Sequence, residues 1–508
     1  MARKIFDPEQ LRQLDRLTID RQYNGNSYDL MEHAARRFTR QFLTHFNDNE
    51  RPVLVLCGPG NNGGDGFAVA RMLVRQGFPV QVWTLDDARP ATEDARLNHK
   101  RWRRLRESDT HSFSKNFPEI DPRTIVIDAL LGSGLSRPVT KGSLRALIRH
   151  INGLPNTVVS VDLPSGVFAD QPVPKKAEAI RADRTISFQA PKLSFFFPET
   201  ADYLGEWELA DIGLNEAAMR DTPVRYHYQT AADMRQFLKP RGRFDHKGSF
   251  GHVLSVAGSF GKMGAALLCG RGALRVGAGL VTLYVPRCGY EIAQIGFPEA
   301  MVLTDPHLQC ISEAPTVEGY RCVAIGPGLG TGELTERALG DLLKKTDRPV
   351  VLDADALNLL ARHPEWFEFL PKNSILTPHP KEFQRLFGST TDSFEQLKTL
   401  QEAAQKHELV IVLKGGRTAV AEPDGTVTFN MSGNPGMGTG GTGDVLTGMI
   451  AGLLAQGYEP VVAARLGVFL HGAAGDRARE VLSQESLLAT DVLRYIGSAF
   501  ARIREQTV

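Results

Sequence analysis

Two glycine-rich segments of this 508-residue sequence carry acidic side chains where phosphate or proton chemistry needs them. The first, Cys57–Gly66, follows a short apolar run and precedes a helical pattern. The second, Asn434–Asp444, also precedes an apolar helical pattern. Glycine lets a ligand approach the backbone closely, and the free N–H groups at a helix start attract anions. Both segments are therefore candidate sites for a phosphorylated ligand.

The first segment has the G-x-G-x-x-G spacing of dinucleotide-binding turns from Gly58 to Gly63, and Asp86 lies about the expected distance downstream. A tight turn between a strand and a helix uses glycines in the same way, so the spacing alone is a weak signal. Asp65 adds information, because a carboxylate beside a phosphate cradle is unfavourable unless a partner such as a cation offsets its charge.

Two further strand ends in the first half carry acids. One apolar run ends at Asp128 before a second glycine loop, and another ends at Asp162 and Ser165. Ligands of open parallel sheets bind at the carboxyl ends of the strands. We therefore expect Asn62, Asp128 and Ser165 to converge on a hard cation through oxygen ligands. Each aspartate taken singly is also typical of a helix cap or a turn.

The second segment contains more glycine than a helix cap requires. Gly440–Gly443 would leave several backbone N–H groups facing one point at a helix start, which is an anion hole for a phosphoryl group in transfer. Asp444 stands beside this run, where it can accept a proton from a hydroxyl nucleophile. The sequence spells no Walker loop and no protein-kinase signature set, so phosphate handling must rest on this loop.

Alternating strand and helix patterns must position these groups. In the first half they predict helices at Asp7–Phe46 and Phe67–Gln76, and strands at Pro52–Cys57, Val80–Leu85, Thr124–Ile127, Thr157–Val161 and Arg184–Phe188. In the second half they predict helices at Gly264–Arg275 and Asp444–Leu454, and strands at Gly251–Ala257, Leu280–Val285, Cys322–Ile325, Pro349–Asp353, Ser374–Thr377, Val410–Lys414 and Thr418–Ala421. The pattern weakens between Ile212 and Thr230. We expect two α/β domains, residues 1–220 and 226–508, each with a mostly parallel sheet.

Composition narrows the partners and the compartment. Lys and Arg number 59 against 58 Asp and Glu, so bulk charge favours neither nucleic acid nor anionic lipid as a partner. No apolar run approaches the roughly 18 residues of a membrane span. The five cysteines form no CxxC pair, which is typical of a reducing compartment. The N-terminus becomes charged too early for a signal peptide. We expect a cytoplasmic homo-oligomer that acts on small molecules.

The first half resembles the NAD(P)HX epimerase family over about residues 10–220. The motifs that carry the resemblance are Gly-x-Gly-Asn-Asn-Gly-Gly-Asp-Gly, Asp-Ala-Leu-x-Gly-Ser-Gly-Leu and Asp-Leu-Pro-Ser-Gly, in that order. It implies a Rossmann-like three-layer domain, with potassium bound by Asn62, Asp128 and Ser165. It also implies a set of residues that contact the hydrated nicotinamide nucleotide: Asn61, Asn62, Gly63, Gly64, Asp65, Gly132, Ser133, Gly134, Leu135, Ser136, Arg137, Pro138 and Asp162.

Epimerising the C6 hydroxyl requires this group to leave and return, or the ring to open and close. Both routes need an acid–base group at hydrogen-bond distance. We expect Asp162 to act in this role. Lys192, which lies where the family has a lysine near the site, would assist it as a charged group. The alternative for Lys192 is an ordinary surface charge.

The second half resembles ribokinase-like small-molecule kinases in the Asn434–Asp444 loop, and six further segments narrow the resemblance to the NAD(P)HX dehydratase family over about residues 230–505. These segments are Gly258–Ala266, Gly272–Leu280, Gly326–Gly330, Asp353–Asn358, Thr377–Glu382 and Lys414–Thr418. The resemblance implies a ribokinase-like α/β domain that uses ADP. The C6 hydroxyl of the S hydrate would be phosphorylated, and phosphate would then leave to restore NADH or NADPH.

Individual residues have plausible roles in this scheme. Asp444 would activate the hydroxyl, and Glu382 would help to place Mg²⁺. Asp353 and Asp355 are either linked to a metal or cap the following helix. The hydrate pocket would be formed by Ala265, Gly328, His379 and Asp444, although His379 also fits a loop residue packed for shape. The nucleotide would be held by Lys414, Gly415, Gly416, Arg417, Thr418, Asn434, Gly440, Gly441, Thr442 and Gly443.

Two alternatives remain open at this stage. The glycine–aspartate loop by itself allows a kinase for a sugar or a vitamin precursor. The first half would then be a dinucleotide-binding regulatory domain, a reading supported only by the G-x-G-x-x-G spacing. Polar residues at three strand ends are more than binding alone requires, and they favour the enzymatic interpretation.

Overall fold

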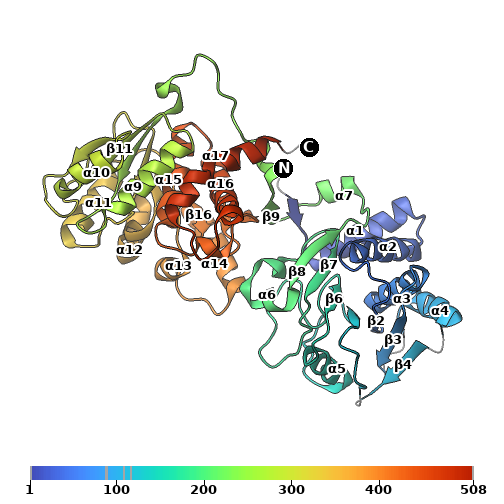
Figure 1. Ribbon diagram of the computed structural model, residues 1–508. Coiled ribbons are helices and arrows are strands. Elements are labelled where there is room, and N and C mark those ends of the chain that lie inside the picture. Colours follow the sequence, from blue (N-terminus) through green and yellow to red (C-terminus); the bar gives the residue numbers. More distant parts are fainter. Residues whose placement is uncertain (1–2, 86–89, 107–108, 115–116, 506–508) are drawn as a thin grey trace. The chain divides into compact units, whose positions relative to one another are not determined.

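A computed structural model describes residues 3–85, 90–106, 109–114 and 117–505 (Figure 1). Asp86, the acid predicted downstream of the first glycine segment, lies outside these residues. The chain separates into two compact units. One consists mainly of Lys4–Val224 and is called the N-unit below; the other consists mainly of Arg225–Thr391 and the residues from Glu395 onward and is called the C-unit.

The N-unit is built on a parallel sheet with the strand order β4-β3-β2-β5-β6-β7-β8. Its strands are β2 (Val53–Cys57), β3 (Val80–Leu85), β4 (Thr110–Phe113), β5 (Ile125–Ala129), β6 (Val158–Val161), β7 (Arg184–Phe188) and β8 (Glu206–Ala210). Its helices are α1 (Pro8–Gln22), α2 (Ser27–His45), α3 (Asn61–Arg75), α4 (Glu93–Arg106), α5 (Gly142–Asn152), α6 (Pro198–Leu204) and α7 (Glu216–Asp221).

Both faces of this sheet are buried, which explains why its strands read as continuous apolar runs. Val53 and Val55 of β2 pack with Phe38 of α2 in one core cluster. The alternate residue Leu54 packs with Leu147 of α5 in a second cluster on the opposite face. Successive side chains of a strand point to opposite faces, so the N-unit has the three-layer arrangement that the sequence predicts.

The C-unit contains a larger sheet in which the order from β9 is β9-β18-β17-β16-β15-β14-β13-β10-β11-β12. Its strands are β9 (Tyr226–Gln229), β10 (His252–Val256), β11 (Leu280–Val285), β12 (Met301–Thr304), β13 (Cys322–Ile325), β14 (Val351–Leu352), β15 (Ile375–Leu376), β16 (Val410–Leu413), β17 (Ala419–Ala421) and β18 (Val427–Asn430). The strands from β12 to β16 pair in parallel, whereas β17 runs antiparallel to both of its neighbours.

Helices cover both faces of this sheet as well. They are α8 (Ala231–Arg235), α9 (Met263–Arg275), α10 (Tyr290–Gly296), α11 (Glu333–Lys345), α12 (Ala354–Arg362), α13 (Pro380–Phe387), α14 (Ser393–His407), α15 (Thr442–Ala455), α16 (Pro460–Val481) and α17 (Ala489–Glu505). Helices α9 and α15 pack on one face through Cys269 and Ile450, and α15 also packs with α16 and α17 in a helical core. In the described part of the chain, no helix is long and apolar enough to cross a membrane.

Three sequence predictions need correction. The single helix expected at Asp7–Phe46 is two helices, because Asn24 (φ 49°) and Gly25 (φ 80°) adopt left-handed conformations between α1 and α2. Helix α3 begins at Asn61, so Gly63 and Gly64 lie inside its first turns and not in a loop. The strands β4, β8, β9, β12 and β18 were not predicted; four of them have partly exposed residues, which weakens the apolar signal of a buried strand.

Candidate active sites

Asn62, Asp128 and Ser165 lie together at the carboxyl ends of neighbouring strands in the N-unit. Asp128 is buried, and its carboxylate accepts hydrogen bonds from Ser165 (Oγ at 2.5 Å and N at 2.8 Å) and from the Ser160 hydroxyl (2.9 Å). Asn62 donates from Nδ2 to the carbonyl oxygen of Leu131 (2.8 Å), and the N–H of Leu131 donates to Ser165 Oγ (2.8 Å). The three predicted side chains therefore gather around one loop residue.

The donor set at this point fits a cation. Burial raises the pKa of Asp128, although hydrogen bonds from Ser165 and Ser160 act to lower it. Gly132 keeps the space beside Asn62 open, because a Cβ there would lie 3.2 Å from Asn62 Oδ1. Among the described residues, no group of three or more His, Cys, Asp or Glu side chains is arranged to hold a metal. A cation here would therefore be held by amide, hydroxyl and carbonyl oxygens beside the single carboxylate.

The glycines at the start of α3 serve close packing as well as ligand access. A Cβ on Gly63 would lie 1.8 Å from the Gly58 carbonyl oxygen, and a Cβ on Gly58 would lie 1.8 Å from the Leu130 carbonyl oxygen. At Gly60, by contrast, no atom of the described chain lies within 4 Å of the Cβ position. The spacing of Gly58 and Gly63 is thus set by contact between backbones, whereas Gly60 borders open space in front of the helix.

Asp162 and Lys192 form a buried ion pair at the carboxyl end of β6. Asp162 adopts a left-handed conformation (φ 65°), and its Oδ1 accepts hydrogen bonds from Lys192 Nζ, from the Phe188 N–H (3.0 Å) and from the Ser187 hydroxyl (3.2 Å). Lys192 is only 2% exposed, so its interpretation as a surface charge is wrong. A left-handed aspartate in a buried charged cluster is typical of a functional site.

Two further acids surround this pair. Burial and the nearby Asp162 carboxylate raise the pKa of Asp65 well above its usual range. Burial and Asp162 also raise the pKa of Asp15 to about 6, against the opposing effect of Lys192. No motif or spacing points to Asp15, which is one acid among several polar residues of the amphipathic helix α1. A carboxyl group with a pKa of about 6, as at Asp15, is suited to exchanging protons near neutral pH.

The loop that follows β5 borders the same site. Gly132 lies beside Asn62, as described above, and Leu135 donates its N–H to the Gly132 carbonyl oxygen at 3.2 Å. The rest of the predicted contact segment is at or near the surface; Gly134, Ser136, Arg137 and Pro138 are exposed, whereas Ser133 is partly buried. This loop can therefore contact a bound ligand without any rearrangement of the core.

In the C-unit, the start of α15 coincides with the segment in which the sequence predicts an anion site. Gly441 precedes the helix with a left-handed conformation (φ 92°), and no described side chain caps the helix start by a hydrogen bond. The first N–H groups of an α-helix have no partner within the helix. The groups contributed by Thr442, Gly443 and Asp444 are therefore available to bind an anion in front of α15.

Lys414 and Asp353 form an ion pair beside this helix start. Lys414 Nζ lies 2.8 Å from Asp353 Oδ1, and Asp353 Oδ2 accepts a hydrogen bond from the Thr447 hydroxyl of α15 (2.7 Å). A Cβ on Gly443 would lie 3.4 Å from Lys414 Nζ, so glycine at this position lets the ammonium group approach the helix start. Thr447 was not predicted; its only sequence signal is a hydroxyl in an otherwise apolar helix.

Asp444 is held among like charges. Burial, followed by the Asp353 carboxylate, raises the pKa of Asp444 to about 7, whereas Lys414 acts to lower it. Burial opposes the charge of Lys414, but Asp353 and Glu382 raise the pKa of Lys414 overall. Asp444 thus combines the position next to an anion site with the proton affinity of a general base that works near neutral pH.

Ala265 and Gly328 lie in contact, as expected for two walls of one pocket. A Cβ on Gly328 (φ 62°) would lie 3.0 Å from the Ala265 Cβ and 2.8 Å from the Lys262 carbonyl oxygen. Asp355 holds the adjoining loops together, because its Oδ2 accepts from the Gly330 N–H (2.8 Å) and from Lys262 Nζ (3.3 Å). Asp355 therefore connects two loops, and the N-cap residue of α12, Asp353, makes no side-chain capping hydrogen bond to this helix.

His379 and Glu382 form a reciprocal cap at the start of α13. His379 Nδ1 accepts from the N–H of Lys381 (3.1 Å) and of Glu382 (3.3 Å), and Glu382 Oε2 accepts from the His379 N–H (2.8 Å). The second Glu382 oxygen, Oε1, lies 3.4 Å from His379 Nε2, and Lys414 Nζ lies 4.0 Å from Oε2. One carboxylate beside a phosphate site fits Mg²⁺ when most of its ligands are phosphate oxygens and water.

The predicted nucleotide residues lie in two adjoining turns. Between β16 and β17, Gly415 and Gly416 are exposed, and the Thr418 hydroxyl donates to the Gly415 carbonyl oxygen (3.2 Å). Arg417 donates to the Met431 carbonyl oxygen (3.1 Å), which joins this turn to the segment after β18. Asn434 in that segment accepts from the Gly436 N–H (3.1 Å), so its side chain shapes the turn, and ligand contact falls to the neighbouring backbone.

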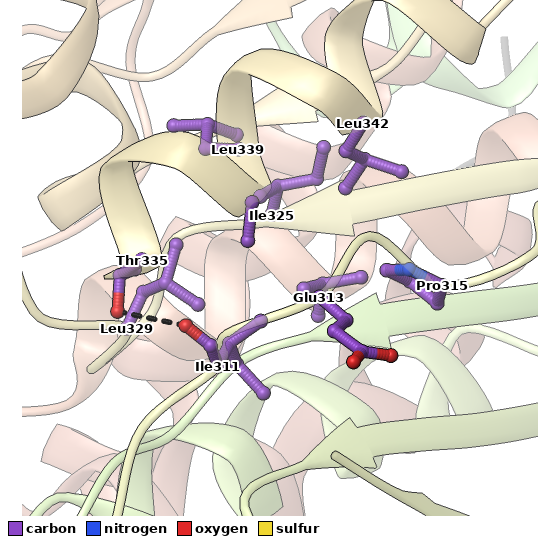
Figure 2. A pocket seen from close by; sticks show the side chains of 10 residues that line it. Ile311, Glu313, Pro315, Ile325, Leu329, Thr335, Leu339 and Leu342 are labelled. Carbon is purple, nitrogen blue, oxygen red and sulfur yellow. Dashed lines mark hydrogen bonds between the residues drawn. The ribbon is translucent and has the colours of Figure 1, made fainter. Parts of the chain in front are cut away.

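A small cavity lies between β13 and α11, and its lining includes Leu329, the chain neighbour of Gly328 (Figure 2). It is lined mainly by apolar side chains, and the Thr335 hydroxyl at its edge donates to the Ile311 carbonyl oxygen (3.0 Å). Glu313 is the charged residue among its lining. The cavity has none of the converging polar groups that mark a ligand site, so it belongs to the packing of α11 on the sheet.

Comparison with known proteins agrees with the division into two parts. The family profile described as YjeF-related protein N-terminus matches residues 27–194, and the profile described as NAD(P)H-hydrate dehydratase matches residues 253–497. A bifunctional NAD(P)H-hydrate repair enzyme from Moorella thermoacetica is 37% identical over 523 residues, which covers 98% of this chain and 96% of that protein.

Solved structures resemble the C-unit. A ribokinase-like superfamily protein from Enterococcus faecalis aligns with a TM-score of 0.50 and 27% identity, covering 56% of this chain and 99% of that one. An ADP/ATP-dependent NAD(P)H-hydrate dehydratase from Bacillus subtilis, crystallised with ATP and Mg²⁺, aligns with a TM-score of 0.49 and 35% identity, covering 54% and 98% of the two chains. The first of these likenesses supports the ribokinase-like fold expected from the sequence.

Proposed function

Since the chain belongs to the family of bifunctional NAD(P)H-hydrate repair enzymes, we propose that its two units carry out successive steps on one damaged cofactor. We assign the NAD(P)H-hydrate epimerase to the domain predicted at residues 1–220, which includes most of the N-unit. We assign the ADP-dependent dehydratase to the domain predicted at residues 226–508, which includes most of the C-unit. The epimerase converts the R hydrate into the S hydrate, and the dehydratase removes water from the S hydrate to restore NADH or NADPH.

In the epimerase, Asp162 acts at the C6 hydroxyl of the hydrate. Lys192 fixes the carboxylate by a buried hydrogen bond and balances its charge. Proton exchange during loss and return of the hydroxyl, or during opening and closing of the ring, requires such a group at hydrogen-bond distance. Asp65 contributes a second acid whose raised pKa favours the protonated form, which can donate to a departing hydroxyl.

A potassium ion beside the epimerase site would be held by Asn62, Asp128 and Ser165. The support is the buried Asp128 carboxylate and the oxygen atoms that gather around Leu131. The ion would supply positive charge next to the segment that receives the nucleotide phosphates. Epimerisation rates in chloride salts of potassium and of a bulky organic cation, at equal ionic strength, test this assignment; equal rates would remove it.

In the dehydratase, Asp444 takes the proton of the C6 hydroxyl while the oxygen attacks the β-phosphoryl group of ADP. AMP leaves, and the N–H groups at the start of α15 stabilise the charge on the phosphoryl group in transfer. Phosphate then leaves C6 while C5 loses a proton, which passes to the departing phosphate or to water, and the C5–C6 double bond forms. The products of the two steps are NADH or NADPH, AMP and inorganic phosphate. Mg²⁺ supplies charge neutralisation to the phosphates when it is bound, and Glu382 is the carboxylate placed to help hold it.

The observation that carries this function is the Asp444 carboxylate, with a pKa of about 7, at the open start of α15 beside the Lys414–Asp353 pair. The test mixes the purified chain with hydrated NADH and ADP and follows recovery of the NADH absorbance band. We expect recovery from both epimers. Phosphorylation of a hydroxymethyl substrate without any recovery of NADH would instead establish the small-molecule kinase that the loop alone allows; the family membership does not favour that reading.

The setting of the enzyme is also part of the proposal. Five free cysteines suit the reducing cytoplasm, where nicotinamide cofactors are abundant. The partners are small molecules, hydrated cofactor and nucleotide, with no role for nucleic acid or membrane. The homo-oligomer expected from the sequence is tested by light scattering of the purified chain, and a mass of one chain would exclude it.

A further inference from the structure

One face of helix α16 touches two turns of the segment after β18, residues 433–436 and residues 437–442, and the second of these turns leads into α15. His471, Gly472, Gly475 and Asp476 are spaced so that they share this face, since residues three and four apart are neighbours on the surface of an α-helix. None of the four was singled out by the sequence motifs. Each of them lies against the segment from Ser432 to Thr442, which contains four of the predicted nucleotide residues: Asn434, Gly440, Gly441 and Thr442.

His471 holds the start of α15. Its Nε2 lies 2.9 Å from the Thr442 carbonyl oxygen, so this nitrogen carries the hydrogen, and burial lowers the pKa of His471 to about 4. The Thr442 hydroxyl in turn lies 3.0 Å from the carbonyl oxygens of Met437 and Thr439. The neutral imidazole therefore fixes the residue from which the N–H groups of the anion site begin.

Asp476 holds the other turn one helical turn further along α16. Its Oδ2 accepts from the Gly433 N–H (2.9 Å), and its Oδ1 accepts from Asn434 Nδ2 (3.0 Å). With its amide nitrogen held in this way, Asn434 uses its oxygen to accept from the Gly436 N–H. Asp476 thus sets the shape of the turn through one backbone and one side-chain contact.

The two glycines between them explain why the helix comes so near. A Cβ on Gly472 would lie 2.4 Å from Ser432 Oγ, and a Cβ on Gly475 would lie 2.2 Å from Met437 Sδ. Any larger residue would push α16 away from both turns. The absence of side chains at these two positions brings His471 and Asp476 within hydrogen-bond distance of the loops.

We infer that His471 and Asp476 are positioning residues of the dehydratase: His471 aligns the phosphoryl-binding start of α15, and Asp476 shapes the turn that receives the nucleotide. The inference rests on the proposed function of the C-unit. It assigns different kinetic effects to two residues of one helix. Loss of the His471 contact should reduce kcat, because the anion site stabilises the phosphoryl group in transfer, whereas loss of the Asp476 contact should raise the KM for ADP.

The His471 contact is tested with three substitutions in the full chain. H471Q keeps a donor near the position of Nε2, H471N places its amide near Nδ1 and H471L has no donor. We expect H471L and H471N to lower dehydratase kcat about 10–100-fold, the usual effect of removing a group that orients an active-site residue, and H471Q to recover most of it. Equal activity of H471Q and H471N, or a wild-type kcat for H471L, would overturn the role of Nε2.

The Asp476 contact is tested with D476N, which can accept only one of the two hydrogen bonds. We expect the KM for ADP to rise about 10-fold with kcat changed little, and R479Q on an exposed part of the same helix to behave as wild type. A loss confined to kcat would contradict the assignment. Epimerase activity of the same chains reports whether the N-unit is intact, and thermal unfolding reports whether the variants are folded.

Failure of the inference can be told apart from failure of the proposed function. Wild-type chain that restores no NADH from hydrate and ADP would refute the proposed function directly. Binding of ADP alone, measured by calorimetry, does not depend on the hydrate. D476N that binds ADP as tightly as the wild type would then refute the inference, whatever the identity of the second substrate.

Discussion

Lys192 Nζ donates a hydrogen bond to Asp162 Oδ1 in the N-unit, and the two residues come from segments 30 positions apart. Asp162 reaches this contact through a left-handed backbone, with φ at 65°, which a non-glycine residue adopts at a cost in energy. The same carboxylate oxygen accepts from the Phe188 N–H and the Ser187 hydroxyl. A left-handed backbone and three hydrogen-bond donors therefore fix the position of one carboxylate oxygen of Asp162.

Replacing Lys192 should abolish epimerisation while the dehydratase continues to work. K192M removes the ammonium group and leaves the Asp162 carboxylate buried without its charged partner. We expect epimerase kcat to fall about 10²–10⁴-fold, the usual contribution of positioned acid–base groups. The measurement is interconversion of R and S hydrates by chiral separation.

The matched control for this variant is K176M, since Lys176 is exposed in the same unit. K176M should retain the wild-type rate. Dehydration of purified S hydrate should be unchanged in both variants, because that reaction belongs to the other unit. An epimerase rate in K192M equal to that of K176M would show that the buried pair serves the fold alone.

The raised pKa of Asp444 predicts how dehydratase activity depends on pH. Only the ionised carboxylate can accept the hydroxyl proton, and burial together with Asp353 raises the pKa of Asp444 to about 7. We therefore expect kcat/KM for the S hydrate to rise with pH and to level off above about pH 7. D444N should lose about 10²–10⁴-fold in kcat at every pH. A profile that is flat from pH 5 to pH 8 would contradict this assignment.

The same group should lower the stability of the chain at neutral and alkaline pH. The folded-state pKa of Asp444 lies above the ordinary value of 3.8, so the folded state binds more protons between about pH 4 and pH 7. The free energy of unfolding must then fall as the pH rises through this window. D444N removes this dependence, and we expect its Tm at pH 8 to exceed that of the wild type by more than it does at pH 4.

Replacing Gly328 with alanine should weaken binding of the hydrate. In G328A the Cβ would lie 2.8 Å from the Lys262 carbonyl oxygen, and the residue would keep a left-handed φ of 62°. The conformational cost alone is roughly 1–2 kcal/mol. We expect a higher KM for the hydrate and a lower Tm. G264A is the control, because no atom of the described chain lies within 4 Å of its Cβ position, and its kinetics should match the wild type.

The sequence predicted which strand-end side chains lie together better than it predicted the packing around them. Apolar strands and strand-end acids are local patterns, so the parallel sheets and the meeting of Asn62, Asp128 and Ser165 could be foreseen. Asp15 and Thr447 could not, because they enter the sites from helices whose direction depends on tertiary packing. A single acid or hydroxyl on a helix has no distinguishing spacing.

The glycine segment of the N-unit shows the same limit. Its spacing indicates a turn that admits a phosphate, and the structure places the helix start one residue after Gly60. What the spacing does not reveal is that Gly58 and Gly63 are required by contacts between backbones. A glycine in this motif can be required by a close contact between backbones or by access for a ligand. Only the distances in the folded chain separate these two causes.

These two causes can be separated by alanine substitutions at Gly63 and Gly60. In G63A the Cβ would lie 1.8 Å from the Gly58 carbonyl oxygen, so α3 would have to move away from β2. Overpacking of this kind costs about 1–3 kcal/mol, and we expect a lower Tm together with loss of epimerase activity. In G60A the added methyl group meets no described atom within 4 Å, so stability should be kept. If Gly60 serves ligand access, G60A should raise the KM for the hydrate at an unchanged Tm; equal Tm values for G63A and G60A would show that backbone contact does not determine the spacing.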